Sequence, residues 1–135
     1  MKELNVEASL DNLDIVTEFV DEQISGLDLG FKAQMQIEMA IEELFSNIAK
    51  YAYTESGPAT VRVEVKRSEF ISILITFIDN GVPYDPLAKN DPDLSPEAKM
   101  QSEGGLGIFM VKRSMDDVEY EYKNGQNILT VLKKI

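Results

Sequence analysis

The residues best able to do chemistry lie in three short stretches of this 135-residue chain. The first, EELFSNIAK at residues 42–50, falls within an apolar pattern that repeats at helical spacing. On that helix Glu43, Asn47 and Lys50 are four and then three residues apart, so their side chains form one ridge. Asn47 offers an amide oxygen to Mg²⁺, Glu43 could accept a proton from a hydroxyl group, and Lys50 could pair with phosphate. Taken alone, this triplet is more typical of a solvated helix face.

The second stretch is IDNGVPYDP, at residues 78–86, where an apolar strand ends at Asp79. A carboxylate at a buried strand end is costly unless it accepts hydrogen bonds, and the exocyclic amine of a purine is a good donor. Gly81 has no side chain and would let a flat base approach the backbone. The alternative is an ordinary Asx turn that closes the strand.

The third stretch is EGGLGIFMVK, at residues 103–112, where glycines surround the start of a predicted helix at 106–114. A helix N-terminus presents unpaired N–H groups and favours phosphate, and Gly104, Gly105 and Gly107 would let phosphate oxygens come close. The spacing matches neither the dinucleotide fingerprint nor the P-loop. The alternative is a flexible hinge.

These stretches need a scaffold, and the periodicity of the chain predicts one. Alternating patterns and apolar runs predict five strands, and helical spacing predicts two helices before the one at 106–114. An Asn-Gly pair at 124–125 predicts a hairpin between the last two strands. We therefore expect a single α+β domain over 1–135, a two-layer sandwich with helices on one face of a mixed, mostly antiparallel sheet. The predicted strands are 4–8, 61–65, 70–78, 118–122 and 128–132, and the first two helices are 10–24 and 31–53.

Composition narrows the classes of partner and of chemistry. The net charge of −11 opposes binding to nucleic acid and to anionic membranes. There is no cysteine and no histidine, which excludes disulfides, thiolate nucleophiles, histidine bases and a phosphohistidine on this chain. No signal peptide and no membrane-spanning run is visible, so we expect a cytoplasmic protein.

In this order and spacing the three stretches resemble the N box, G1 box and G2 box of the Bergerat-fold (GHKL) ATPase superfamily. The nearest resemblance is to small anti-sigma factor serine/threonine kinases of the RsbW and SpoIIAB type. The matching segments are EELFSNIAKYAY, DNGVPYDP, GGLGIFMVKRSMDDVEY and the terminal GQNILTVLKK.

The resemblance implies the Bergerat two-layer fold, ATP and Mg²⁺ as cofactors, and a mobile ATP lid over residues 87–103. It also implies a role for each matching residue. These are Glu43 as catalytic base, Asn47 as Mg²⁺ ligand, Asp79 as adenine-binding carboxylate, Gly81 beside the base, Lys50 as a phosphate contact, and Gly104, Gly105, Leu106 and Gly107 at the phosphates.

The implied reaction transfers the γ-phosphoryl group of ATP to serine or threonine on a STAS-domain anti-sigma factor antagonist. A sigma factor is a second implied partner, and relatives are often homodimers, so we expect one here. The chain departs from many relatives at Thr17, where they carry a partner-binding arginine. This departure and the long lid motivate one alternative, a non-catalytic, nucleotide-dependent module that sequesters a regulatory partner. Two others are the catalytic half of a histidine kinase, whose histidine-bearing helix a partner chain would supply, and a purely structural domain that binds no ligand.

Overall fold

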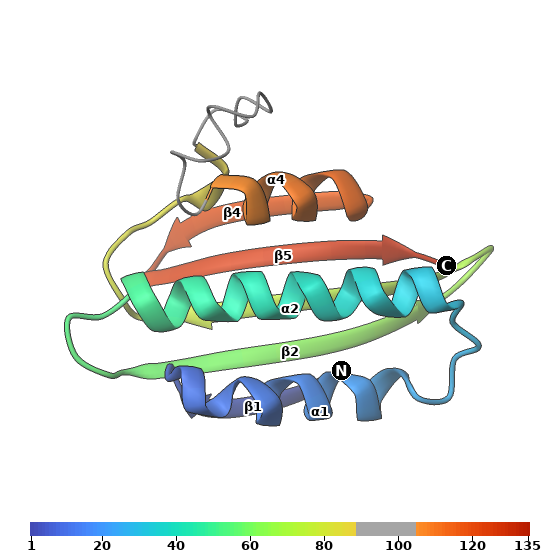
Figure 1. The fold of residues 1–135 in the computed structure, drawn as a ribbon, viewed down its shortest axis with the longest axis horizontal. Coiled ribbons are helices and arrows are strands. Elements are labelled where there is room, and N and C mark those ends of the chain that lie inside the picture. The colour runs from blue at the N-terminus through green and yellow to red at the C-terminus, as the bar shows by residue number, and fades with distance from the viewer. Residues whose placement is uncertain (89–104) are drawn as a thin grey trace.

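The chain folds into one sheet with its helices packed on one face (Figure 1). A computed structural model describes residues 1–88 and 105–135. Nearly all of the predicted lid, and Gly104, lie outside these residues. The described strands run in the order β1-β2-β3-β5-β4, and every neighbouring pair is antiparallel. The predicted α+β sandwich is confirmed, with a sheet that is antiparallel throughout its described strands.

The elements follow the predicted order, with small shifts at their ends. The strands are β1 (Lys2–Glu7), β2 (Pro58–Arg67), β3 (Ile71–Asp79), β4 (Asp117–Lys123) and β5 (Gln126–Lys134). The helices are α1 (Leu13–Ile24), α2 (Phe31–Tyr51) and α4 (Gly105–Ser114), with short 3-10 turns at Leu10–Asn12 and Pro86–Ala88.

The start of the first helix differs from the prediction of one helix over 10–24. A 3-10 turn precedes α1 because the side chain of Ser9 accepts a hydrogen bond from the Asp11 N–H at 3.2 Å. The Asn12 side chain also donates to the carbonyl of Glu7 at 2.9 Å. These two bonds favour a tight first turn over a continuous α-helix.

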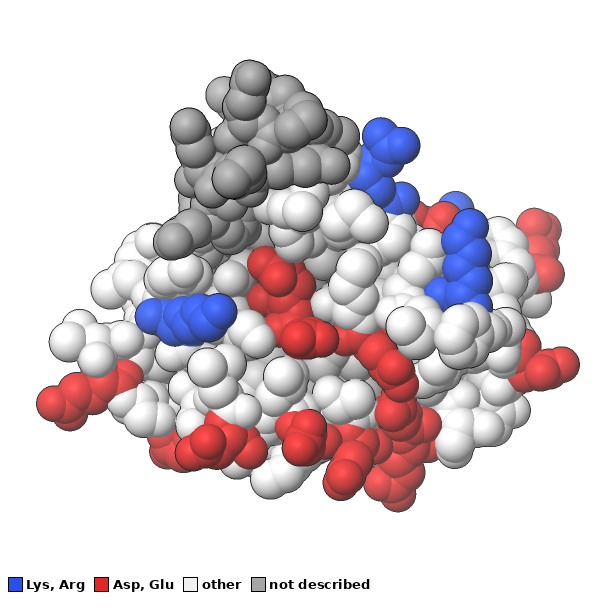
Figure 2. Space-filling view, viewed as in Figure 1, with Lys and Arg blue, Asp and Glu red and all other residues white. Residues whose placement is uncertain are grey.

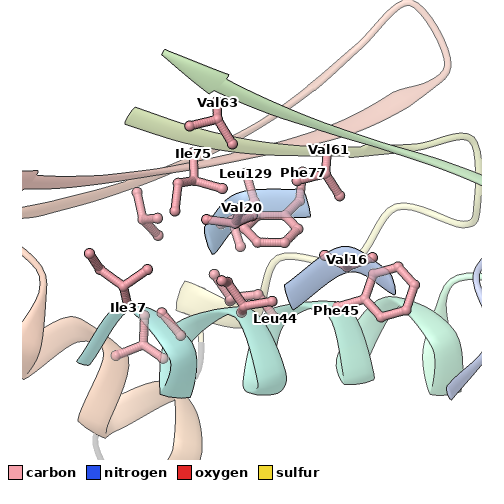
Figure 3. Packing of buried hydrophobic residues seen from close by; sticks show 14 of the residues in the cluster. Val16, Val20, Ile37, Leu44, Phe45, Val61, Val63, Ile75, Phe77 and Leu129 are labelled. Atoms are coloured by element: carbon pink, nitrogen blue, oxygen red, sulfur yellow. The ribbon is translucent and has the colours of Figure 1, made fainter. Parts of the chain in front are cut away.

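The core lies between the sheet and the helices (Figure 3). Alternate residues of the central strands point to the helical face, as the period-2 pattern predicts. They meet the apolar stripe of α2, where Ile37, Ile41, Leu44 and Phe45 are almost fully buried. The sheet side is formed by Val61, Val63, Ile73, Ile75, Phe77, Leu129 and Val131.

The hairpin between β4 and β5 turns at the predicted pair. Asn124 and Gly125 both have positive φ, 55° and 77°, as a type I′ turn requires. This turn sets the register in which Tyr120 faces Leu129 and Tyr122 faces Asn127. The hairpin therefore fixes the position of β5 relative to β4, whereas a separate antiparallel pairing places Asn127 of β5 opposite Asp79 of β3.

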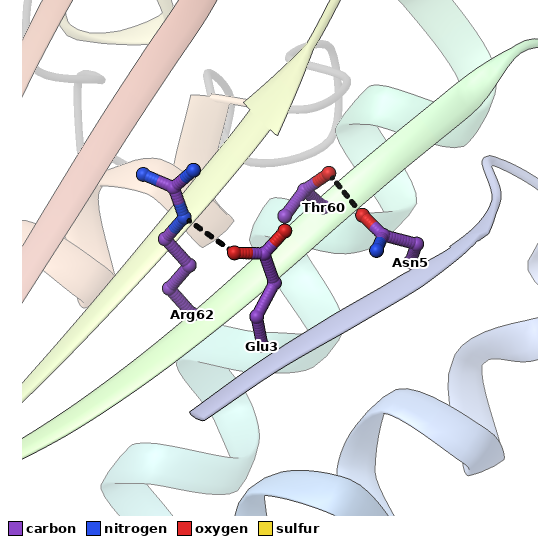
Figure 4. A network of polar contacts seen from close by, with 4 residues as sticks. All are labelled: Glu3, Asn5, Thr60 and Arg62. Atoms are coloured by element: carbon purple, nitrogen blue, oxygen red, sulfur yellow. Dashed lines mark hydrogen bonds and ion pairs between the residues drawn. The ribbon is translucent and has the colours of Figure 1, made fainter. Parts of the chain in front are cut away.

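The surface of the helical face is strongly acidic (Figure 2). At the β1 edge of the sheet the contacts are exposed, such as the 3.1 Å ion pair of Arg62 with Glu3 (Figure 4).

None of the helices in the described ranges is both long and apolar enough to cross a bilayer.

Candidate functional site

A cleft opens between α2, the end of β3 and the β4-β5 hairpin. Its wall is mostly apolar with a few polar groups, the usual make-up of a small-molecule site. The room left for the centre of a water molecule is only about 30 Å³, so a planar ring would enter only after some lining side chains separate. The lining residues are Leu44, Asn47, Ile48, Ala52, Phe77, Asp79, Tyr84, Pro86, Tyr120, Asn127 and Leu129.

Asp79 is the last residue of β3 and is 5% exposed. Its Oδ1 accepts hydrogen bonds from the Gly81 N–H and from Nδ2 of Asn127, each at 2.9 Å. No residue in the described ranges donates to Oδ2, although Asp79 lines the cleft. A buried carboxylate with one oxygen held by the chain can offer its other oxygen to a donor on a ligand.

Gly81 lies against the C-terminal end of α2. A Cβ at this position would overlap the carbonyl group of Ala52, which accepts a hydrogen bond from the Val82 N–H at 2.9 Å. The structure therefore gives a reason for glycine here that needs no ligand, since only Gly lets this turn close on the helix. The predicted contact of Gly81 with a base stays a prediction.

The ridge predicted on α2 is present, but its three members have different surroundings. Asn47 lines the cleft, Glu43 is half-buried one turn earlier, and Lys50 is exposed in the last turn of the helix. Desolvation raises the pKa of the Glu43 carboxyl above its ordinary value; Lys50 opposes this shift and Glu42 adds to it. A carboxylate with a raised pKa is a better proton acceptor near neutral pH.

One glycine of α4 meets this ridge. Gly107, in the first turn of α4, faces the Glu43 carboxyl group so closely that a Cβ on Gly107 would overlap it. Leu106 is 42% exposed beside it, and Gly105 begins the helix. The helix N-terminus, with its partial positive charge, therefore lies next to the half-buried carboxylate.

The structure brings the predicted residues into two adjoining groups. Asn47 and Asp79 share the cleft, and Gly81 lies in the turn that follows Asp79. Glu43 and Gly107 adjoin the cleft through α2 and α4. Gly104 is outside the described residues.

Three polar residues of the cleft are absent from the sequence-based set: Tyr84, Tyr120 and Asn127. The sequence does contain a sign that Asn127 is buried, because the period-2 pattern of β5 places it on the same inward face as Leu129 and Val131. A polar side chain at an inward position of a strand calls for a buried partner.

Known proteins resemble this chain in sequence and in fold. The sequence pattern described as "Histidine kinase-like ATPase domain" matches residues 6–133. The chain is 24% identical over 100 residues to "Serine/threonine-protein kinase BtrW" of Bordetella bronchiseptica, covering 74% of this chain and 70% of that protein. It is 27% identical over 105 residues to "Serine-protein kinase RsbW" of Listeria monocytogenes, covering 73% of this chain and 65% of the relative.

Among solved structures, the chain resembles the histidine kinase domain of the Erythrobacter litoralis EL346 blue-light activated histidine kinase. The TM-score is 0.55 at 13% identity, over 91% of this chain and 59% of that one. At this identity the likeness concerns the fold alone. The match spans only about two thirds of the length of the two kinase relatives.

Proposed function

This chain belongs to the histidine kinase-like ATPase domain family, and we propose that it binds ATP in the cleft and phosphorylates a serine or threonine of a protein partner. The observation that carries the proposal is the Asp79 carboxylate, buried at the cleft with Oδ1 held by the chain. An adenine amine is a matching donor for Oδ2. The names of two relatives as serine or serine/threonine kinases support the reaction class.

The phosphates would extend from the base toward the first turn of α4. Gly104, Gly105, Leu106 and Gly107 would approach them with backbone N–H groups. Lys50, exposed at the end of α2, could pair with a phosphate as a point charge.

Mg²⁺ fits the donor set near Asn47. Among the described residues there is no group of three or more acidic, histidine or cysteine ligands that could hold a metal. Mg²⁺ commonly takes one or two protein ligands and completes its shell with water and phosphate oxygens. The amide oxygen of Asn47 would be such a ligand, and the ion would supply charge neutralisation on the phosphates when bound.

In the proposed transfer Glu43 takes the proton from the acceptor hydroxyl group. The hydroxyl oxygen forms a bond to the γ-phosphorus as the bond from that phosphorus to the bridging oxygen breaks, and ADP leaves. The chain contributes position and electrostatics, which dominate phosphoryl transfer. The raised pKa of Glu43 suits this proton transfer.

The partner we propose is a STAS-domain anti-sigma factor antagonist, with a sigma factor as a second partner and a homodimer as the assembly. The non-catalytic binding module remains the competing function, because Thr17 replaces the partner-binding arginine of the family. In the described structure the Thr17 hydroxyl donates to the Leu13 carbonyl at 3.0 Å, within α1.

The first test is calorimetry with Mg-ATP on the wild type, on Asp79→Asn and on Asp117→Asn. Asp117 gives the same chemical change at an exposed position on β4. A lost hydrogen bond to a charged group costs about 1.5–3 kcal/mol, so Asp79→Asn should weaken ATP binding roughly 10- to 100-fold. Equal ATP affinity for Asp79→Asn and the wild type would refute the assigned base site.

The second test separates the kinase from the binding module. Purified chain, Mg-ATP and a candidate STAS-domain protein are incubated, and phosphoserine or phosphothreonine is sought by mass spectrometry. The kinase requires a phosphoprotein with the wild type and little with Glu43→Gln. A partner that binds both proteins equally and is never phosphorylated would favour the binding module.

A further inference from the structure

We propose that Asn127 is a positioning residue that makes the cleft select 6-amino purines over 6-oxo purines by holding Asp79 in place. The inference rests on the proposed function, because it concerns the base-binding part of the same cleft. Asn127 lies in β5, outside the three stretches at residues 42–50, 78–86 and 103–112 that were predicted to form the site.

Asn127 is 6% exposed and uses both ends of its amide. Its Nδ2 donates to Oδ1 of Asp79 at 2.9 Å and to the carbonyl of Val82 at 2.8 Å. Its Oδ1 accepts from the Tyr84 N–H at 3.1 Å and from the Tyr120 hydroxyl group. The four hydrogen bonds go to three segments, the end of β3, the turn after it and β4, so this side chain connects them to β5.

These partners fix which way the amide faces. The Val82 carbonyl can only accept and the Tyr84 N–H can only donate, so an exchange of Oδ1 and Nδ2 would lose both bonds. The amide therefore presents a donor to Asp79 in the folded chain. A single orientation of Asn127 means a single anchor for the carboxylate.

The register between β3 and β5 places Asn127 directly beside Asp79. Asp79 and Asn127 are partners across β3 and β5, and both face the cleft side of the sheet. With donors from Asn127 and Gly81 on Oδ1, rotation of the carboxylate would break two hydrogen bonds. Oδ2 is thereby kept as an acceptor toward the cleft.

A fixed acceptor distinguishes two kinds of purine. The 6-amino group of adenine can donate to Oδ2, whereas the 6-oxo group of hypoxanthine or guanine would place two acceptors against each other. Without Asn127 the carboxylate keeps one described donor, Gly81, and can turn so that it no longer holds an acceptor against an oxo group. Selectivity should then fall while contacts to ribose and phosphates remain.

The test compares Mg-ATP with Mg-ITP, which share the ribose triphosphate and differ in the base. Affinities are measured by calorimetry for the wild type, Asn127→Leu and Asn127→Asp, with Gln126→Leu as the matched control. Gln126 is the neighbouring amide and donates to Oδ1 of Asn80 at 3.1 Å, so its change also removes one bond to the same turn. Thermal melting confirms that each variant folds, and Asn127→Asp keeps the size of the side chain if Asn127→Leu fails to fold.

We expect the wild type to prefer ATP by about 100-fold or more, since a site built to bond a donor strongly rejects analogues lacking it. Each Asn127 variant should lower this ratio at least about tenfold, because the charge-assisted hydrogen bond from the 6-amino group to Asp79 is lost. The affinity for ITP should change by less than about threefold, and Gln126→Leu should keep the wild-type ratio.

Other outcomes overturn the inference in recognisable ways. Equal losses for ATP and ITP would show that Asn127 serves only the fold. An unchanged ratio in folded Asn127 variants would show that Asp79 needs no such anchor, while the wild-type preference for ATP would leave the proposed function intact. A wild type that binds neither nucleotide would refute the proposed function and this inference with it.

Discussion

Replacing Gly107 with alanine would place a methyl group where the Glu43 carboxyl group now lies. Alanine is favoured over glycine within a helix by about 1 kcal/mol, so α4 alone would gain stability. The overlapping atoms belong to the end of a flexible side chain, so Glu43 would be pushed off its preferred rotamer at a cost of about 0.5–1.5 kcal/mol. The two effects should nearly cancel, and Gly107→Ala should leave the free energy of unfolding close to that of the wild type.

In the Glu43→Ala background, the stabilisation of α4 by Gly107→Ala can be measured without the opposing displacement of Glu43. With the carboxyl group absent, Gly107→Ala should stabilise the chain by the full helical preference of about 1 kcal/mol, or about 3–5 °C in Tm for a domain of this size. The double-mutant cycle therefore predicts a coupling energy of about 1 kcal/mol between positions 43 and 107. Phosphoryl transfer should fall with Gly107→Ala even though the fold is intact, because the proposed base is displaced.

Urea unfolding of the wild type, both single variants and the double variant measures the coupling without any assumption about activity. Gly26→Ala is the control, since a Cβ on Gly26 would meet nothing within 4 Å, and it should show no coupling to Glu43→Ala. Additivity of Gly107→Ala and Glu43→Ala within about 0.3 kcal/mol would refute the contact between α4 and the carboxyl group.

Four further predictions concern stability. Burial raises the pKa of Glu43, so its ionised form disfavours the fold at neutral pH; Glu43→Gln should be more stable than the wild type at pH 8, and the gap in urea unfolding should close as acid protonates Glu43. Phe45 is fully buried, and Phe45→Ala should cost about 3–5 kcal/mol, seen as a large drop in the urea midpoint. The ion pair of Arg62 with Glu3 has side chains about 40% exposed (Figure 4), so Arg62→Ala should change the free energy of unfolding by under about 1 kcal/mol. Gly125 has a φ of 77°, so Gly125→Ala should lower stability by about 1–2 kcal/mol, measurable as a lower Tm.

Several features of the fold follow from local pattern. The inward positions of β2 and β5, the apolar stripe of α2 and the Asn-Gly turn are all confirmed, because side-chain periodicity and turn conformation depend on neighbouring residues. The same reasoning placed Glu43 and Asn47 on one ridge. It missed the 3-10 turn before α1, where Ser9 and Asn12 compete with helical hydrogen bonds.

Contacts between distant segments were beyond such reasoning. Gly81 was interpreted through a ligand, whereas the structure shows it packed on the carbonyl of Ala52, 29 positions earlier in the chain. Gly107 was interpreted through phosphate, and the structure adds its close approach to Glu43. Each contact depends on how two elements dock, which neither segment encodes alone.

Local patterns along the chain are enough to predict the order of helices and strands, the faces they bury and the types of group available for chemistry. Only the folded chain shows that β5 lies beside β3, which sets Asn127 opposite Asp79 and gives that carboxylate a donor. Periodicity is a property of one segment, whereas strand register and hydrogen-bond partners arise only when segments far apart in the chain bury their surfaces together.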